Sequence, residues 1–160
     1  KLKKMKKAVF ILLAVVFALN TESCKKEDTI SPEEQATIDD AIIKDYIATN
    51  GYTASEVGGG VYVQTLKIGT GPAPTSMSVV KVRYKGYLID GTVFDETTTG
   101  IEFGLDQVIQ GWQIGVPYIN AGGSGRLFIP SGRAYGTQAV GEIPANSVLI
   151  FDIDVISTSN

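Results

Sequence analysis

The sequence contains no histidine and a single cysteine, Cys24. Without histidine there can be no Ser–His–Asp triad and no mixed Cys/His zinc cluster, and one thiol cannot form an intramolecular disulfide. We therefore expect no metal site, no cofactor and no activated nucleophile. With 160 residues, 44% of them hydrophobic, the chain is long enough for one compact domain with attachments.

Positive charge is scarce beyond the N-terminus. Five of the 14 basic residues lie within the first seven positions, so the chain without residues 1–23 carries nine basic and sixteen acidic residues, a net charge of −7. No basic stripe remains that could follow a phosphate backbone. We expect no nucleic-acid binding.

The N-terminus has the pattern of an export signal. Lysines precede an apolar run over residues 8–19, and this run of about 12 residues is shorter than the roughly 20 that a helix needs to span a bilayer. Cys24 follows at the expected cleavage position and resembles the lipidated first residue of a bacterial lipoprotein. We therefore expect a lipoprotein signal peptide at 1–23, lipidation of Cys24 and a polar tether over 24–30. The alternative is an ordinary cleaved signal with no role for Cys24.

Residues 31–58 are expected to form an amphipathic helix and a linker. A capping box with proline at the first helical position stands at 31–34, and Ile38, Ile42 and Tyr46 recur every four residues, with Ile43 and Ile47 beside them. The helix should end near residues 50–51, with a flexible joint at the three glycines 58–60. We expect it to pack on its own domain in a monomer; a dimerisation arm is the alternative.

From residue 61 onward the hydrophobic period changes to two, which is typical of strands. The pattern predicts strands near 61–66, 80–88, 93–95, 127–129 and 148–152, and a loop over 96–100. Val108, Trp112 and Val116 are spaced by four and predict one short helix within 107–121. Several antiparallel strands with one inserted helix indicate an α+β fold.

Seven segments in this half resemble the FKBP family of peptidyl-prolyl cis–trans isomerases, in the family's order and with near-family spacing over residues 79–156. They are Val82–Leu88, Asp90–Asp95, Val108–Trp112, Ile129–Pro130, Ala134–Gly136, Ile143–Pro144 and Leu149–Asp152. The resemblance implies a twisted antiparallel β-sheet wrapped around one short helix, with an isomerase domain over residues 59–160.

The resemblance also implies the functional residues. Trp112 would form the floor for the substrate proline, and the backbone N–H of Ile109 and the hydroxyl of Tyr135 would hold substrate carbonyls. The residues implied as catalytic are Tyr84, Asp95, Trp112 and Tyr135, and those implied as substrate-binding are Phe94, Phe103, Val108, Ile109, Ile143 and Phe151.

The implied activity is acceleration of X–Pro isomerisation in exported proteins. The expected partners are proline-containing polypeptide clients and, through lipid on Cys24, a membrane. The expected location is the bacterial cell envelope, as an outer-membrane lipoprotein on the periplasmic or surface face. The alternative is a proline-binding or chaperone module with the same fold and little turnover, because Glu142 stands in a region that is usually apolar in the family.

Overall fold

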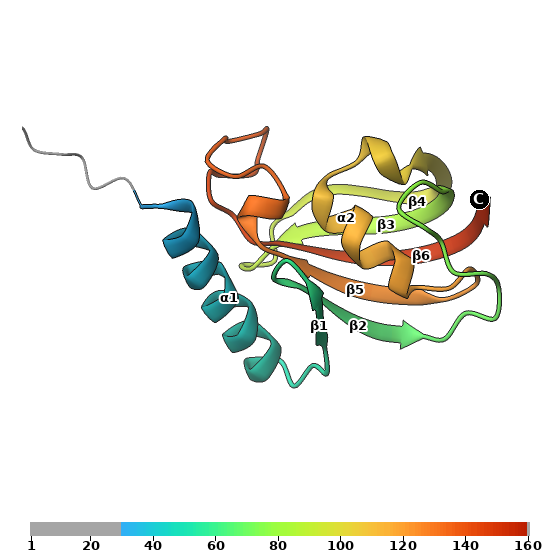
Figure 1. The fold of residues 1–160 in the computed structure, drawn as a ribbon, viewed down its shortest axis with the longest axis horizontal. Helices are drawn as coiled ribbons and strands as arrows, with labels where there is room; N and C mark the ends of the chain where they lie inside the picture. The colour runs from blue at the N-terminus through green and yellow to red at the C-terminus, as the bar shows by residue number, and fades with distance from the viewer. Residues whose placement is uncertain (1–29, 160) are drawn as a thin grey trace, which may run out of the picture.

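The computed structural model of the chain describes residues 30–159, so the predicted signal peptide, Cys24 and the tether up to residue 29 lie outside the described residues. Three short 3-10 helices connect the larger elements: η1 (Leu105–Gln107), η2 (Val116–Tyr118) and η3 (Ser131–Arg133). The larger elements, shown in Figure 1, are α1 (Pro32–Thr49), β1 (Ser55–Gly58), β2 (Val61–Lys67), β3 (Val79–Leu88), β4 (Val93–Gly104), α2 (Gln110–Gly115), β5 (Ser124–Ile129) and β6 (Leu149–Ser159).

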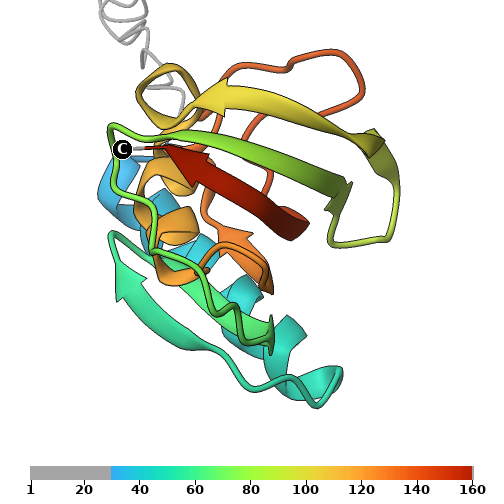
Figure 2. The ribbon, with the colours of Figure 1, turned by 90° about the vertical axis from the view of Figure 1, so that its right-hand side faces the viewer.

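The six strands form one sheet in the order β1-β2-β5-β6-β3-β4, and every neighbouring pair is antiparallel. The sheet is strongly curved, and its strands curl around α2 in Figure 2. This arrangement confirms the predicted α+β fold, with a twisted antiparallel sheet around one short helix and an additional helix at the N-terminus.

Helix α2 lies against the inner face of the sheet at very short range. A Cβ atom on Gly111 would collide with the side chain of Ile129 on β5, so only glycine allows this approach. The main hydrophobic core lies between α2 and the strands and includes Val61, Leu127 and Phe151. The predicted helix is shorter than its hydrophobic period indicated, because Val108 lies before α2 and Val116 begins η2.

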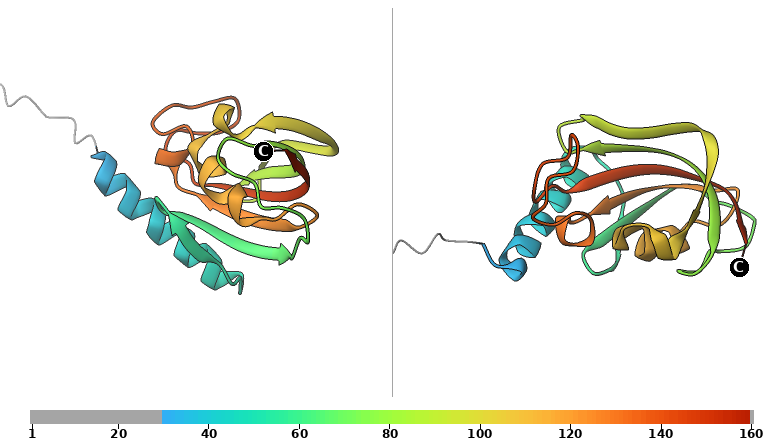
Figure 3. Two further views of the ribbon diagram at one scale, coloured as in Figure 1. Left: turned by 45° about the vertical axis from the view of Figure 1, so that its right-hand side comes forward. Right: turned by 90° about the horizontal axis from the view of Figure 1, so that it is seen from above.

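Helix α1 lies on the other face of the sheet, as the two views in Figure 3 show. Ile43 is fully buried in a second cluster with Phe128 and Ile150. The capping box is formed, since the backbone N–H of Glu34 donates to the Ser31 hydroxyl. The helix therefore packs on its own domain, as predicted.

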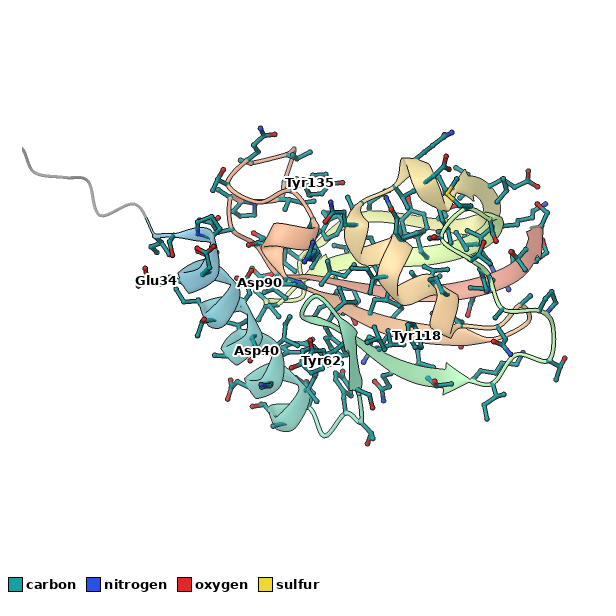
Figure 4. All side chains as sticks on the ribbon, viewed as in Figure 1. Glu34, Asp40, Tyr62, Asp90, Tyr118 and Tyr135 are labelled. Atoms are coloured by element: carbon teal, nitrogen blue, oxygen red, sulfur yellow. The ribbon has the colours of Figure 1, made fainter. Side chains whose placement is uncertain are left out.

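The buried side of α1 is only part of the apolar side that the hydrophobic period predicted, namely the part with Ile43, Tyr46 and Ile47. Ile38 and Ile42 are each 38% exposed, whereas Asp39 and Ile43 are completely buried. The carboxylate of the neighbouring Asp40 accepts a hydrogen bond of 2.7 Å from the Tyr62 hydroxyl on β2 (Figure 4). Polar contacts to the sheet thus rotate the helix away from its most apolar side.

Two predicted loops are part of the sheet. The segment expected to be a linker contains β1, and glycines 58–60 make the β1–β2 turn with φ angles of 126°, 60° and 78° instead of a flexible joint. The predicted loop at 96–100 is also wrong, because β4 continues through it. One of the two register shifts on β4 lies between Thr97 and Ile101, so a bulge takes up residues that an uninterrupted ladder could not pair.

Candidate functional site

A cavity of about 560 Å³ opens between the inner face of the sheet, α2 and the long β5–β6 connection. All ten side chains predicted to be catalytic or substrate-binding line it, and they come from three strands, α2 and two loops. The structure therefore brings the whole predicted set together, although the role of each residue stays a prediction. The set is Tyr84, Phe94, Asp95, Phe103, Val108, Ile109, Trp112, Tyr135, Ile143 and Phe151.

The indole of Trp112 lies at the centre of the aromatic lining and is only 3% exposed. The ring centroids of Tyr84, Phe103 and Phe151 lie 5.2, 5.9 and 5.3 Å from it, with interplanar angles of 86–89°. Edge-to-face contacts of this kind are the favoured arrangement of aromatic rings. Each of these three rings therefore packs directly against the indole.

Gly86 on β3 leaves room for two of these rings. A Cβ atom there would lie 2.6 Å from Cε2 of Phe94 and 2.8 Å from Cε1 of Phe151. The same glycine is paired to β4 on one side and to β6 on the other, so its backbone cannot move aside. The absence of a side chain at position 86 therefore sets how deeply the two phenyl rings lie in the wall.

The polar side of the cavity centres on Tyr84 and Asp95. The Tyr84 hydroxyl donates a hydrogen bond of 2.6 Å to the carboxylate of Asp95. Burial, together with this hydrogen bond, raises the pKa of Tyr84 well above its ordinary value. The hydroxyl is therefore neutral at physiological pH and is occupied as a donor, so it orients the carboxylate at the mouth of the cavity.

Two further donors face the cavity without a partner. Among the described residues none accepts a hydrogen bond from the Tyr135 hydroxyl or from the backbone N–H of Ile109. Tyr135 is 38% exposed on the β5–β6 connection, where Figure 4 labels it. Both groups can therefore donate a hydrogen bond to an acceptor that enters the cavity.

Four lining residues are absent from the predicted set: Gln107, Val140, Gly141 and Glu142. The last three lie in a small turn that is closed by mutual backbone hydrogen bonds of 2.9 Å between Val140 and Ile143. This turn places Glu142 on the rim. For Glu142 the sequence signal was its departure from the apolar residues usual in the family in that region; for the other three it was proximity to the Ile143–Pro144 and Val108–Ile109 motifs.

Within residues 30–159 there is no cluster of three or more His, Cys, Asp or Glu side chains that could hold a metal ion. None of the helices described there is both long and apolar enough to cross a membrane.

Comparisons with known proteins agree on one family. The sequence model of the family described as FKBP-type peptidyl-prolyl cis-trans isomerase matches residues 71–156. A relative named FKBP-type peptidyl-prolyl cis-trans isomerase FkpA, from Aeromonas hydrophila, is 40% identical over 121 residues, covering 71% of this chain and 44% of the relative. A Saccharomyces cerevisiae peptidyl-prolyl cis-trans isomerase is 43% identical over 106 residues, covering 64% of this chain and 26% of its own length. The chain thus spans less than half of these curated relatives.

Solved structures show the same likeness. The crystal structure of a peptidyl-prolyl cis-trans isomerase from Pseudomonas syringae pv. tomato has a TM-score of 0.71 at 35% identity, covering 82% of this chain and 99% of that one. Escherichia coli FkpA has a TM-score of 0.68 at 30% identity, covering 99% of this chain and 73% of that one.

Proposed function

Because the chain belongs to the family of FKBP-type peptidyl-prolyl cis-trans isomerases, we propose that it accelerates cis–trans isomerisation of X–Pro bonds in exported polypeptides. The observation that carries the proposal is the aromatic cavity around Trp112, which is lined by rings on several sides and is open to an entering chain. A proline ring is apolar, compact and of a size that such a cavity accepts.

The cavity supports a non-covalent mechanism. The barrier to isomerisation, about 18–20 kcal/mol, arises because the amide loses its resonance when it twists. The twisted amide is less dipolar than the planar one, so water stabilises the planar ground state more. Placing the bond against Trp112 and Phe151, both almost fully buried, removes that water. The cavity therefore binds the twisted amide better than the planar one, which is the condition for catalysis.

The free donors would fix the chain around the twisting bond. The N–H of Ile109 and the hydroxyl of Tyr135 each have no described acceptor and can each bind a backbone carbonyl of the substrate. Holding carbonyls on either side of the bond limits the motion to the bond itself. Asp95 is already bonded to Tyr84 and adds orientation, not proton transfer.

The test is an isomerase assay on residues 25–160, which include all described residues. Micromolar protein should accelerate cis-to-trans conversion of a Leu-Pro or Phe-Pro peptide, and Trp112→Ala should abolish most of the acceleration. Because Trp112 is buried, Tyr135→Phe serves as a second variant that leaves the core intact. A wild-type rate equal to the uncatalysed rate would contradict the proposal. Peptide binding without acceleration would support the alternative of a proline-binding or chaperone module.

We also propose that the protein acts at the bacterial cell envelope, anchored in the outer membrane by lipid on Cys24, with exported proline-containing proteins as clients. The basic and apolar N-terminal pattern ending at the lone cysteine supports this location. Radioactive palmitate should label the full-length chain expressed in a bacterium and fail to label Cys24→Ser. Labelling of both proteins, or of neither, would refute the anchor.

We propose that the protein is a monomer. The packing of α1 on its own sheet supports this, because Ile43 is already fully buried within the chain. A light-scattering mass of residues 25–160 that equals one chain is the expected result, and a mass of two chains would refute it.

A further inference from the structure

Helix α1 carries a carboxylate that is completely buried. Asp39 is 0% exposed and lies on the side of the helix that faces the sheet and its loops. Its Oδ2 atom accepts two hydrogen bonds of 2.7 Å from Ser131, one from the backbone N–H and one from the hydroxyl. Its Oδ1 atom accepts a third, of 2.8 Å, from the side-chain amide of Gln35. A carboxylate taken out of water is costly unless it is bonded in this way.

Ser131 passes this restraint on to the cavity. It is the first residue of η3 and is 1% exposed. Its carbonyl accepts hydrogen bonds of 2.9 Å from the backbone N–H groups of both Ala134 and Gly136. These are the two residues on either side of Tyr135, whose ring lines the cavity. A single buried carboxylate on α1 is thus connected to a cavity residue through one serine.

The contact does more than hold α1 on the sheet. Ile43, one turn further along the helix, already supplies apolar packing against Phe128 and Ile150. The polar contact goes instead to the segment that carries Tyr135, which is exposed and whose hydroxyl bonds to no described residue. The β5–β6 connection that holds this segment runs over residues 130–148, outside the ladders of the sheet. Such a segment needs a restraint from elsewhere if its side chain is to stay within reach of substrate.

We propose that Asp39 is a positioning residue for Tyr135, so that the N-terminal helix is a working part of the substrate site. The expected effect on turnover rests on the proposed isomerase function. The restraint of the Tyr135 segment by Asp39 does not depend on that function. Asp39 lies outside residues 71–156, the part matched by the family model. The helix therefore supplies, from outside the matched region, one restraint on the Tyr135 segment, in addition to the hydrogen bonds of Arg133 to Gln110 and of the Asn146 N–H to the Gly136 carbonyl.

The test uses three variants of the full-length chain. Asp39→Leu keeps the approximate size and removes every acceptor. In Asp39→Asn the amide oxygen can still accept the hydrogen bonds from Ser131. The new NH₂ group can donate to the Gln35 side-chain oxygen once that amide turns over. This variant is therefore the conservative rescue. Ile43→Ala is the control, because it weakens the packing of α1 without touching Ser131.

Two readouts separate positioning from stability. The first is native-state hydrogen exchange at the Ala134 and Gly136 amides, compared with the Ile150 amide in the sheet. The second is kcat/KM with a Leu-Pro peptide, measured at a temperature where all variants are folded. We expect Asp39→Leu to speed exchange selectively at the two amides and to lower kcat/KM about tenfold. We expect Asp39→Asn to stay within about threefold of wild type, and Ile43→Ala to retain wild-type kcat/KM.

Unchanged exchange at Ala134 and Gly136 in Asp39→Leu would overturn the inference. Equal losses of kcat/KM in Asp39→Leu and Ile43→Ala would overturn it too, because α1 would then act only through stability. If the wild-type chain has no isomerase activity, the proposed function fails, and the exchange readout still decides whether Asp39 restrains the segment around Tyr135.

Discussion

Replacing Gly86 by alanine is the sharpest test of how the cavity wall is built. The added methyl group would lie 2.6 and 2.7 Å from two atoms of the Phe94 ring and 2.8 Å from the Phe151 ring. Ordinary contacts of this kind are about 3.5–4.0 Å. Both rings must therefore move by about 1 Å, since Gly86 is held by both neighbouring strands.

The two rings differ in their freedom to move. Phe151 is 5% exposed and is packed edge-on against both Trp112 and Phe94. Phe94 is only partly buried and can swing toward the open cavity. Overpacking of this kind costs typically about 1–3 kcal/mol of stability. The displaced Phe94 ring occupies space that the substrate proline needs, so we expect kcat/KM to fall by about ten- to a hundredfold, mainly through KM.

The assay is peptide isomerisation together with urea unfolding. Gly132→Ala is the matched control, because a methyl group at Gly132 meets no atom within 4 Å and its φ is not in the left-handed region. It should leave kcat/KM unchanged and keep or slightly raise stability. Wild-type kcat/KM in Gly86→Ala, with stability lowered as expected, would refute the assignment of Phe94 and Phe151 to the substrate wall.

Three more predictions concern polar groups. Tyr84→Phe removes the 2.6 Å hydrogen bond to Asp95; because the pair is solvent-accessible, we expect a loss of about 1 kcal/mol in urea unfolding and about fivefold in kcat/KM. Burial raises the pKa of the Tyr87 hydroxyl. Above about pH 10 the unfolded chain therefore loses this proton while the native state keeps it. The free energy of unfolding then falls by up to about 1.4 kcal/mol per pH unit. Tyr87→Phe should make that fall shallower; an unchanged slope would contradict the reasoning. Glu142→Gln removes a rim charge and should raise kcat/KM for a Glu-Pro peptide about threefold at low salt only.

The apolar part of the site was predicted through the resemblance to the FKBP family, which implied Tyr84, Phe94, Trp112 and Phe151. The hydrophobic period alone predicted only the strands and the short helix that carry these residues. Once the sheet closes around α2, the inward side chains of neighbouring strands must meet. The period alone does not distinguish a residue that lines the cavity from one that is simply buried in the core.

The polar and irregular parts did not follow from pattern. The hydrophobic period of α1 placed Ile38 and Ile42 on the same buried side as Ile43, and no pattern assigns that side to an aspartate. Asp39 is buried because Ser131, 92 positions later, supplies two donors, and a contact over such a separation has no local signal. The bulge in β4 and the strand β1 were missed for a similar reason, since the pairing that stabilises each lies on another strand.

The two parts of the site impose different requirements on the fold. The aromatic floor is fixed by the sheet, because its rings lie on paired strands and on a helix packed through Gly111. The Tyr135 hydroxyl lies on a connection that is not paired in the sheet. In the proposed mechanism it must keep a fixed distance from the aromatic floor, so that it can bind a substrate carbonyl while the amide twists. A helix on the opposite face can add a restraint to this connection only beyond the ends of β5 and β6, where the chain leaves the sheet. The Asp39–Ser131 hydrogen bonds provide that restraint, which is why a change on α1 should alter turnover while the floor around Trp112 stays intact.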